Sequence, residues 1–311
     1  MKFLSQTGLT SIVTIFLIGA IITMIFLASN QFKQEDLNVS VPSPEETSQP
    51  TATPSATPTA TPSAKPSVTP TPAPVVNNTP PGSGFAIQTV SVDGQNFKVA
   101  IVAADLNSTR VIVDTASESD CAMDCPVLSL GDYASRNGAW AGINGSYFCP
   151  ADYASCADKK NSFDTLLMNK DKRYFNSDNN VYSTVPAAIF SAGSARFVGQ
   201  SLEWGRDTGV DSVIANYPLL VAGGNVNFTE APNEPKFGGA ASRTFIANKG
   251  NMVYIGIVYG ASMGQSAKVL QAMGMDGALN LDQGGSTALW SGGYKAGPGR
   301  NIPNAVLFVR R

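Results

Sequence analysis

The segment 281–286 holds residue types that suit chemistry better than packing. Asp282 follows a short apolar run, and Gly284, Gly285 and Ser286 come shortly after it. Glycine permits backbone conformations with positive φ, and successive exposed N–H groups can form a concavity that binds an anion. We therefore expect Asp282 to be a catalytic carboxylate beside an anion-binding loop. The alternative is a turn residue whose side chain bonds only its own loop.

Arg243 lies among small residues in the segment 238–244, just before an apolar run. Its guanidinium could clamp a phosphate or a carboxylate through paired hydrogen bonds, because the neighbouring glycines leave space for a ligand. We expect Arg243 to be the second catalytic residue. A surface ion pair is the alternative.

The chain contains no histidine among its 311 residues. Ser-His-Asp triads, Cys-His dyads and histidine-ligated metals are therefore excluded, and acid–base chemistry must use Asp, Glu, Tyr, Lys or Cys. Asp152, Asp164 and Glu230 are the remaining carboxylates in polar, loop-like surroundings, and the sequence does not rank them as a second acid or base. We expect no cofactor and no metal, although a cation held by Asp282 is the alternative.

The charge balance excludes another class of function. Lys and Arg number 21 and Asp and Glu number 23, which leaves a net charge of −2 at pH 7. No broad basic surface is implied, so we expect no nucleic-acid partner. The sequence leaves the oligomeric state open.

Two stretches of the chain each predict a helix, a glycine that ends it and a short strand. In the first stretch, the apolar spacing predicts a helix over 127–136, followed by Gly138. A strand over 139–143 then leads into an Asn-Gly-Ser turn at 144–146.

The second stretch repeats this arrangement. Ser262 can cap a helix over 263–273, and Gly274 ends it. A strand over 278–281 then leads directly into the loop of Asp282.

Asn144 and Asn280 occupy equivalent places, because each lies six residues after the glycine that ends its helix. We expect the two units to deliver these side chains to one shared site, where the amides hydrogen-bond sugar hydroxyls. The alternatives are a chance similarity and asparagines that only tie down their own turns.

The remaining pattern of the domain is dominated by strands. A hairpin is predicted over 85–102, because two strand-like runs flank an Asp-Gly pair. Further strands are predicted over 109–114, 187–190, 213–220 and 252–258. Strands and helices do not alternate regularly, so the doubly wound pattern is absent. We expect an α+β domain over 85–311 with a mixed β-sheet and a few packed helices.

The N-terminal part of the sequence predicts a membrane-targeting segment followed by a linker. Residues 10–29 are almost entirely apolar and long enough to cross a bilayer, so we expect a transmembrane anchor preceded by a cytoplasmic segment over 1–9. A cleaved signal segment is the alternative. Residues 30–84, rich in Pro, Thr and Ser, predict a disordered, extended linker. The domain would be anchored on the extracytoplasmic side, or secreted if the segment is cleaved.

The chain has four cysteines, at Cys121, Cys125, Cys149 and Cys156. Their spacing does not match paired zinc knuckles, and an exported domain favours two disulfides. All three possible pairings remain open at this point.

Three places in the chain together resemble the phosphodiester glycosidase family, over about 85–311. The segment 141–148 looks like the family's Asn-Gly-Gly-x-Phe strand end. Arg243 and Thr244 look like its Arg-Thr pair, and the segment 280–286 is close to its Leu-Asp-Gly-Gly-Gly-Ser loop. Their order and spacing make the resemblance specific.

The resemblance implies an exported hydrolase that cleaves a sugar-1-phosphodiester bond, similar to that of an N-acetylglucosamine phosphodiester, in envelope or exopolysaccharide material. Asp282 would stabilise an oxocarbenium-like centre or act as base or nucleophile, and Arg243 would neutralise charge on the departing phosphate. The residues expected to bind this carbohydrate-phosphate substrate are Asn144, Gly145, Ser146, Thr244, Asn280, Gly284, Gly285 and Ser286.

Ser146 and Gln283 depart from the family pattern, because each stands where the family has glycine. Both change the pocket wall, so the identity of the sugar does not carry over. The competing interpretation is a non-catalytic polysaccharide-binding or assembly module of the envelope. A binding module would carry aromatic side chains along a groove, for which Trp140, Trp204 and Trp290 are the candidates.

Overall fold

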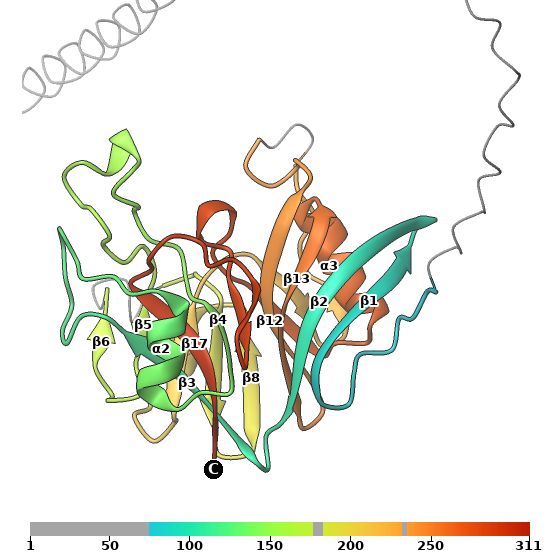
Figure 1. The fold of residues 1–311 in the computed structure, drawn as a ribbon, viewed down its shortest axis with the longest axis horizontal. Helices are drawn as coiled ribbons and strands as arrows, with labels where there is room; N and C mark the ends of the chain where they lie inside the picture. Colours follow the sequence, from blue (N-terminus) through green and yellow to red (C-terminus); the bar gives the residue numbers. More distant parts are fainter. Residues whose placement is uncertain (1–74, 177–182, 232–234) are drawn as a thin grey trace, which may run out of the picture. The chain divides into compact units, whose positions relative to one another are not determined.

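The computed structural model describes residues 75–176, 183–231 and 235–311 (Figure 1). The predicted cytoplasmic segment, the predicted anchor over 10–29 and most of the predicted linker lie outside the described residues. No helix within the described ranges has the length and apolar character needed to cross a membrane.

The largest sheet has seven strands in the order β1-β2-β13-β12-β14-β10-β11. These strands are β1 (Gly84–Val92), β2 (Gln95–Asp105), β10 (Leu219–Ala222), β11 (Asn225–Val226), β12 (Ala241–Lys249), β13 (Met252–Ala261) and β14 (Gly277–Asn280). β1 and β2 form the predicted hairpin, whose turn residues Asp93 and Gly94 have φ angles of 51° and 75°. Positive φ at both central positions is what a tight hairpin turn requires.

Two further sheets have five strands each, in the orders β16-β15-β4-β17-β3 and β6-β5-β9-β7-β8. The first contains β3 (Thr109–Thr115), β4 (Ala141–Asn144), β15 (Leu289–Ser291), β16 (Tyr294–Ala296) and β17 (Asn304–Arg310). The second contains β5 (Leu167–Met168), β6 (Tyr174–Phe175), β7 (Ala187–Ser191), β8 (Ser194–Val198) and β9 (Ser212–Ala215).

The expectation of a mixed sheet is wrong, because all strand pairings within these three sheets are antiparallel. Antiparallel neighbours can be joined by short turns, whereas parallel neighbours need long crossover connections, usually helical. The described part of the chain has two α-helices, so the domain is mainly β. The strand predicted over 213–220 is also wrong: β9 and β10 belong to different sheets, and Pro218 between them has no N–H to donate.

Both α-helices form close to where the sequence predicts them. Helix α2 (Leu130–Asn137) begins at Ser129, whose hydroxyl accepts a hydrogen bond from the N–H of Asp132, and ends at Gly138 in the left-handed conformation. Helix α3 (Met263–Ala272) begins at Ser262, which forms a capping box with Gln265. Such caps satisfy N–H groups that the first helical turn leaves without acceptors.

The core joins the seven-stranded sheet to the sheet of β3, β4 and β17, and the third sheet adds Leu167, Phe190 and Ile214 to the same buried cluster. Val102 and Ile246 of the larger sheet belong to one buried cluster with Val113, Ile143 and Val306 of the smaller one. Burial of each such side chain contributes roughly 1.5–3 kcal/mol. This packing holds the two sheets in a fixed relation, and with them the loops that follow their strands.

Each α-helix covers one of these two sheets. Helix α3 contributes Met263 and Leu270 to a buried cluster with strands of the seven-stranded sheet, and α2 contributes Leu130 and Tyr133 to a cluster with β17. Around these two sheets the layers therefore follow the order helix, sheet, sheet, helix.

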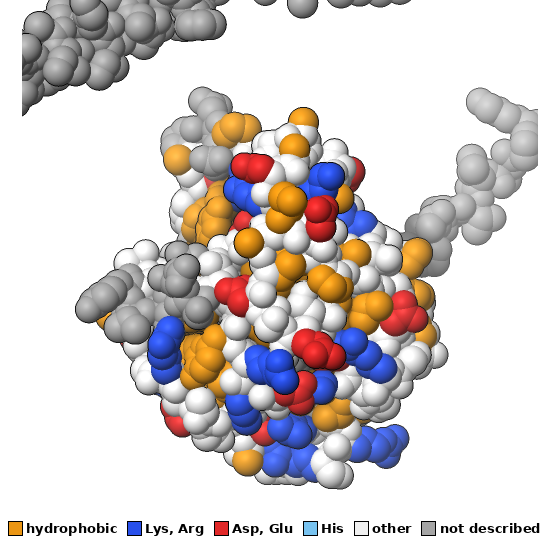
Figure 2. Space-filling model, turned by 90° about the vertical axis from the view of Figure 1, so that its left-hand side faces the viewer, with side chains coloured by type: hydrophobic (Ala, Val, Ile, Leu, Met, Phe, Trp, Pro, Cys, Tyr) orange, Lys and Arg blue, Asp and Glu red, His pale blue; other side chains and the backbone are white. Residues whose placement is uncertain are grey.

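The segment 75–83 differs from the expectation of a disordered linker. Val76 forms a bridge with Thr89 of β1, and the side chain of Asn78 exchanges hydrogen bonds with the backbone of Ser91. This segment covers the outer edge of β1 at residues 88–91, which protects that part of the strand edge. On the face drawn in Figure 2, both acidic and basic side chains are present.

Candidate active site

Three hydrogen bonds hold the backbone of Asp282, directly after β14. Its N–H donates to the carbonyl oxygen of Gly145 at 2.9 Å, which joins this loop to the end of β4. Its carbonyl oxygen accepts from the Nδ2 atom of Asn144 at 2.6 Å and from the hydroxyl of Thr244. The two helix–glycine–strand units of the sequence therefore meet at Asp282.

The side chain of Asp282 lines a pocket of about 640 Å³. Pockets of roughly 300–1,000 Å³ are typical of sites for small ligands. Its charged lining residues are Lys159, Asp164, Lys236, Asp282 and Arg300. Two carboxylates and three cations thus face one space.

Burial raises the pKa of the Asp282 carboxyl from its ordinary value of 3.8 to about 6. A hydrogen bond from Ser286, one from the N–H of Gln283 at 2.8 Å and the charge of Arg300 act against this rise, while the charge of Asp164 adds to it. Perturbed carboxyls in pockets are typical of catalytic groups. At neutral pH this carboxyl is mostly ionised, yet it can take up a proton.

Asp164 is the second carboxylate of the pocket, and the sequence does not rank it above the others. Partial burial raises the pKa of Asp164, and the charges of Lys159 and Lys236 oppose the rise. The other two carboxylates have different partners: Asp152 pairs with Arg300 at 2.8 Å, and Glu230 accepts from the N–H of Gly264 at the start of α3.

Asn144 and Thr244 do not reach the pocket, in contrast to the expectation that they bind substrate. Both side chains are fully buried. Besides its bond to Asp282, Asn144 accepts a hydrogen bond from the N–H of Ala288 at 3.1 Å. Both residues therefore position the loop that carries the carboxylate.

Gly145 and Ser146 do not line the pocket either. Both contact Asn304 at the start of β17. A Cβ atom on Gly145 would lie 1.7 Å from the Oδ1 atom of Asn304, so only glycine fits there. The same Oδ1 atom accepts from the N–H of Ser146 at 2.9 Å. Asn304 was not identified from the sequence, because it lies 158 residues from Ser146 and has no motif around it.

Asn280 is fully buried and contacts the pocket through a tyrosine. Its Nδ2 atom donates to the hydroxyl of Tyr147 at 2.8 Å and to the carbonyl oxygen of Tyr217 at 3.0 Å. Both tyrosines line the pocket. An aromatic after the first Asn-Gly-Ser turn is the signal that could have identified Tyr147.

Arg243 does not face the pocket and is only 2% exposed. Its guanidinium donates to the carbonyl oxygens of Ala261, Phe237 and Gly239 and to the side chain of Gln283 at 2.9 Å. The free clamp expected from the sequence is therefore absent in this arrangement. Arg243 instead supports the loop from behind, and the glycines beside it supply carbonyl acceptors rather than space.

Gly284, Gly285 and Ser286 form the one-turn 3-10 helix η4 (Gly284–Ser286) at the pocket wall. Gly284 has a φ angle of 65°, which favours glycine, and it lines the pocket together with Ser286. Gly285 lies against the guanidinium of Arg300, a residue that sequence reasoning missed.

Lys236 and Tyr217 form a second feature of the wall that the sequence did not reveal. The ammonium of Lys236 bonds the hydroxyl of Tyr217 at 3.0 Å and lies 4.6 Å from the ring centroid of Tyr147. Such cation–π contacts order a lysine beside an aromatic surface. The three tryptophans named as candidates for the alternative binding module do not line this pocket: Trp204 is buried, Trp140 packs on Phe308 and Trp290 on Tyr294.

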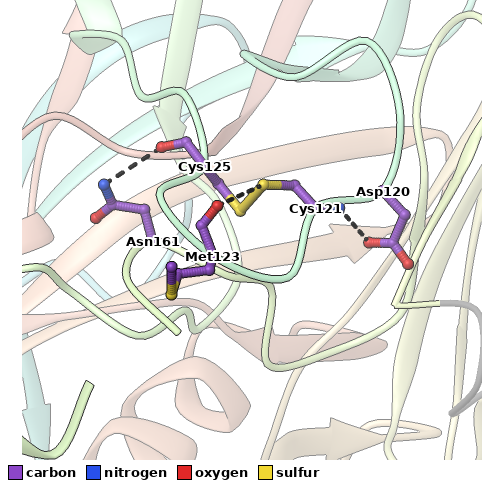
Figure 3. Close-up of a disulfide and its surroundings, with 5 residues drawn as sticks. All are labelled: Asp120, Cys121, Met123, Cys125 and Asn161. Carbon is purple, nitrogen blue, oxygen red and sulfur yellow. Dashed lines mark hydrogen bonds between the residues drawn. A yellow bond between two sulfur atoms is a disulfide. The ribbon is translucent and has the colours of Figure 1, made fainter. Parts of the chain in front are cut away.

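The four cysteines form two disulfides, Cys121–Cys125 and Cys149–Cys156. Figure 3 shows the first, where the carbonyl oxygen of Cys125 accepts a hydrogen bond from Asn161 at 3.3 Å. The second closes a loop whose residues line the pocket beside Asp282. The disulfide expectation is confirmed, and the spacing alone could not select this pairing.

A second polar hollow, of about 470 Å³, lies near the end of β3. Its buried carboxylate, Asp114, is already paired with Arg136 at 2.6 Å and with Asn137 at 2.6 Å. Because these donors satisfy its carboxylate, Asp114 is not available for acid–base chemistry.

Comparison with known proteins gives one family match and several structural ones. The model of the phosphodiester glycosidase family matches residues 137–309. The zebrafish N-acetylglucosamine-1-phosphodiester alpha-N-acetylglucosaminidase catalytic domain, auto-inhibited by its pro-peptide, aligns with a TM-score of 0.58 at 16% identity, over 73% of this chain and 83% of that one. A hypothetical protein from Synechocystis aligns with a TM-score of 0.53 at 14% identity, over 73% and 62%. At these identities the structures show a shared fold. No curated protein gives a significant sequence match.

Proposed function

This chain belongs to the phosphodiester glycosidase family, and on that premise we propose that it hydrolyses the bond between the anomeric carbon of a sugar and a phosphodiester oxygen. The observation that supports the proposal best is the carboxyl of Asp282, whose pKa is raised to about 6, in the wall of a pocket of about 640 Å³. This is a group able to act on a glycosidic bond at near-neutral pH.

The leaving group suits a site without histidine. When the bond from the anomeric carbon to oxygen breaks, its electron pair stays on the phosphate, which departs as a phosphate monoester and needs little protonation. The oxygen of water forms the new bond to the anomeric carbon. The proton released by this water passes to a carboxylate of the pocket.

We assign a different catalytic role to each of the two carboxylates in the pocket. Asp282, ionised at neutral pH, stabilises the positive charge that develops at the anomeric carbon. Asp164 accepts the proton of the attacking water, since partial burial raises its pKa and makes it a better base than an exposed aspartate. Arg243 acts as a positioning residue, through Gln283 and the carbonyl oxygens around it.

The aromatic side of the pocket is proposed to hold the sugar. The Nδ2 atom of Asn280 can only donate, so the hydroxyl of Tyr147 accepts this hydrogen bond and keeps its own proton for another acceptor. A substrate oxygen in the pocket is a suitable acceptor. Tyr217 adds an aromatic surface next to Tyr147, with ring centroids 5.4 Å apart.

The proposed substrate is an N-acetylglucosamine-phosphodiester-like bond in envelope or exopolysaccharide material. It rests on the fold shared with the zebrafish enzyme, whose name gives this bond as its target. The proposed location is extracytoplasmic, with an N-terminal anchor over 10–29 or secretion after cleavage. Two disulfides support it, because such bonds persist in oxidising compartments.

A non-catalytic polysaccharide-binding module is the second candidate. Two exposed aromatic side chains favour it, since Tyr153 is 51% exposed and Tyr217 is 38% exposed at the same pocket. Exposed tyrosines in a hollow are suitable for sugar binding without cleavage. The two candidates differ in one respect, the release of free sugar.

The test is sugar release by the purified full-length chain from UDP-linked and p-nitrophenyl-linked α-N-acetylglucosamine. Release from the phosphate-linked donor should fall by about a hundred- to ten-thousandfold in Asp282→Asn. Asp276→Asn is the matched control, because Asp276 is exposed, precedes β14 and does not line the pocket. Turnover of the folded Asp282→Asn variant near the wild-type level would refute the proposal.

A further inference from the structure

We infer that Arg300 forms an anion subsite for the phosphate group of the substrate, and that the loop closed by the Cys149–Cys156 disulfide holds it in place. The inference rests on the proposed function and deepens it, because it assigns one side of the same pocket. Arg243, the candidate from the sequence, is buried behind the loop of Asp282 and has its guanidinium bonded to carbonyl oxygens and Gln283.

The guanidinium of Arg300 lies directly on the backbone of Gly285. A Cβ atom at position 285 would lie 2.2 Å from the Nη2 atom and 2.8 Å from the Nε atom of Arg300. These distances are far shorter than real contacts, so a side chain at position 285 would displace the guanidinium from this place. The backbone N–H of Arg300 also donates to the carbonyl oxygen of Gly285 at 2.8 Å. Arg300 is thus fixed to η4, which begins two residues after Asp282.

The disulfide-closed loop supplies two further contacts to Arg300. Its Nη1 atom donates to the Oδ1 atom of Asp152 at 2.8 Å, and its guanidinium lies 5.2 Å from the ring centroid of Tyr153. Both partners lie between Cys149 and Cys156, whose Cα atoms are 5.4 Å apart. An arginine that is ordered in advance loses less conformational entropy when it binds an anion.

The ion pair of Arg300 with Asp152 is too weak to explain by stability alone why Arg300 is held in this position. The side chain of Asp152 is 65% exposed, and exposed ion pairs contribute little to stability. Among the described residues, no other side-chain hydrogen bond occupies the guanidinium of Arg300. It therefore retains N–H donors in the planar geometry that binds phosphate through paired hydrogen bonds.

The surroundings favour Arg300 over Lys236 as the group that binds the phosphate. Lys236 contacts the rings of Tyr147 and Tyr217, so it belongs to the aromatic side assigned to the sugar. Arg300 lies close enough to Asp282 for its charge to lower the pKa of that carboxyl. A phosphate on Arg300 would therefore sit beside the carboxylate that stabilises the anomeric carbon.

The first test measures binding of inorganic phosphate to the full-length chain by titration calorimetry, without turnover. Arg300→Gln should weaken phosphate binding about tenfold or more, the effect of losing charge-assisted hydrogen bonds. Lys159→Gln is the matched control, because it removes one positive charge from the same pocket and should change the affinity much less. Equal affinities of Arg300→Gln and the wild type, or equal losses in both variants, would overturn the subsite.

The second test addresses the loop. Replacement of Cys149 and Cys156 by serine should weaken phosphate binding, whereas replacement of Cys121 and Cys125 should not, since that pair does not line the pocket. Gly285→Ala provides an independent variant with both disulfides intact, and it should also lose affinity because the methyl group displaces the guanidinium. Wild-type affinity in the Gly285→Ala variant, or the same affinity in both folded cysteine variants, would refute the positioning role.

These tests separate the subsite from the proposed function. If the protein binds phosphate through Arg300 but releases no sugar, the anion subsite is supported and the proposed glycosidase function is refuted. If the protein releases sugar but binds phosphate independently of Arg300, the proposed glycosidase function is supported and the subsite at Arg300 is refuted.

Discussion

The side-chain amide of Asn144 donates a 2.6 Å hydrogen bond to the backbone carbonyl of Asp282, across 138 residues of sequence. The Oδ1 atom of the same side chain accepts from the N–H of Ala288 on the far side of η4. One buried amide therefore fixes both ends of the loop that carries the carboxylate. The geometry of the site depends on this bond as much as on the residues that line the pocket.

Asn144→Asp should lower both stability and turnover. The substitution retains an acceptor for Ala288 but sets an oxygen against the carbonyl of Asp282, so this carbonyl keeps only the hydroxyl of Thr244 as a donor, at a cost of about 1–3 kcal/mol. Thermal unfolding and sugar release would measure the two effects. Asn78→Asp is the control, because Asn78 bonds the backbone of Ser91 far from the pocket and should leave turnover unchanged. Normal turnover in Asn144→Asp would contradict the positioning role.

The rate of sugar release should rise with pH, with an apparent pKa of about 6 for the free enzyme. The proposed mechanism needs Asp282 ionised, and burial raises the pKa of this carboxyl to about 6. The measurement is kcat/KM for a phosphate-linked sugar over the range from about pH 4 to pH 8. A profile that stays flat through pH 6 would show that the ionised form of Asp282 is not required.

Stability should depend on pH in the opposite sense. Because the pKa of Asp282 is raised from 3.8 to about 6 in the folded state, the native protein binds more protons than the unfolded chain between these values. Its stability therefore falls as pH rises from about 4 to 6, by at most about 3 kcal/mol, and this contribution is absent above pH 6. Asp282→Asn should be more stable than the wild type above pH 6, as measured by urea unfolding. Equal stabilities there would show that the native site does not disfavour the ionised carboxyl.

Arg243→Met should act mainly on stability. The substitution leaves the carbonyl oxygens of Ala261, Phe237 and Gly239 without this donor and frees Gln283, and a buried acceptor left without its donor costs about 1–3 kcal/mol. A direct phosphate clamp would instead lose substrate affinity while the unfolding temperature stayed the same. Unfolding temperature and KM measured on one preparation therefore separate the two roles.

Local signals in the sequence predict the elements around the site well. Gly138 ends α2, Ser262 begins α3, and the turn at Asp93 joins β1 to β2, because each of these residues acts on its immediate neighbours. The meeting of the two helix–glycine–strand units is likewise predicted from their common spacing and is seen in the bond between Asp282 and Gly145.

The partners of these elements cannot be predicted in the same way. Arg300 and Asn304 contact the loops of Asp282 and Gly145 in the fold where β17 pairs with β4, and no local pattern encodes that pairing. Arg243 shows the converse case, since its small neighbours suggest open space whereas folding fills the space with carbonyl oxygens. Side-chain direction, which separates lining residues from supporting ones, depends on the tertiary packing of the sheets.

The most direct test of the central claim is hydrolysis of a sugar-1-phosphodiester in water enriched in oxygen-18, followed by mass spectrometry of the phosphate product. Cleavage between the anomeric carbon and oxygen places the new oxygen on the sugar, so we predict a phosphate monoester without the label. A labelled phosphate would mean that water attacks phosphorus, and it would contradict the assignment of this site to glycosidic cleavage.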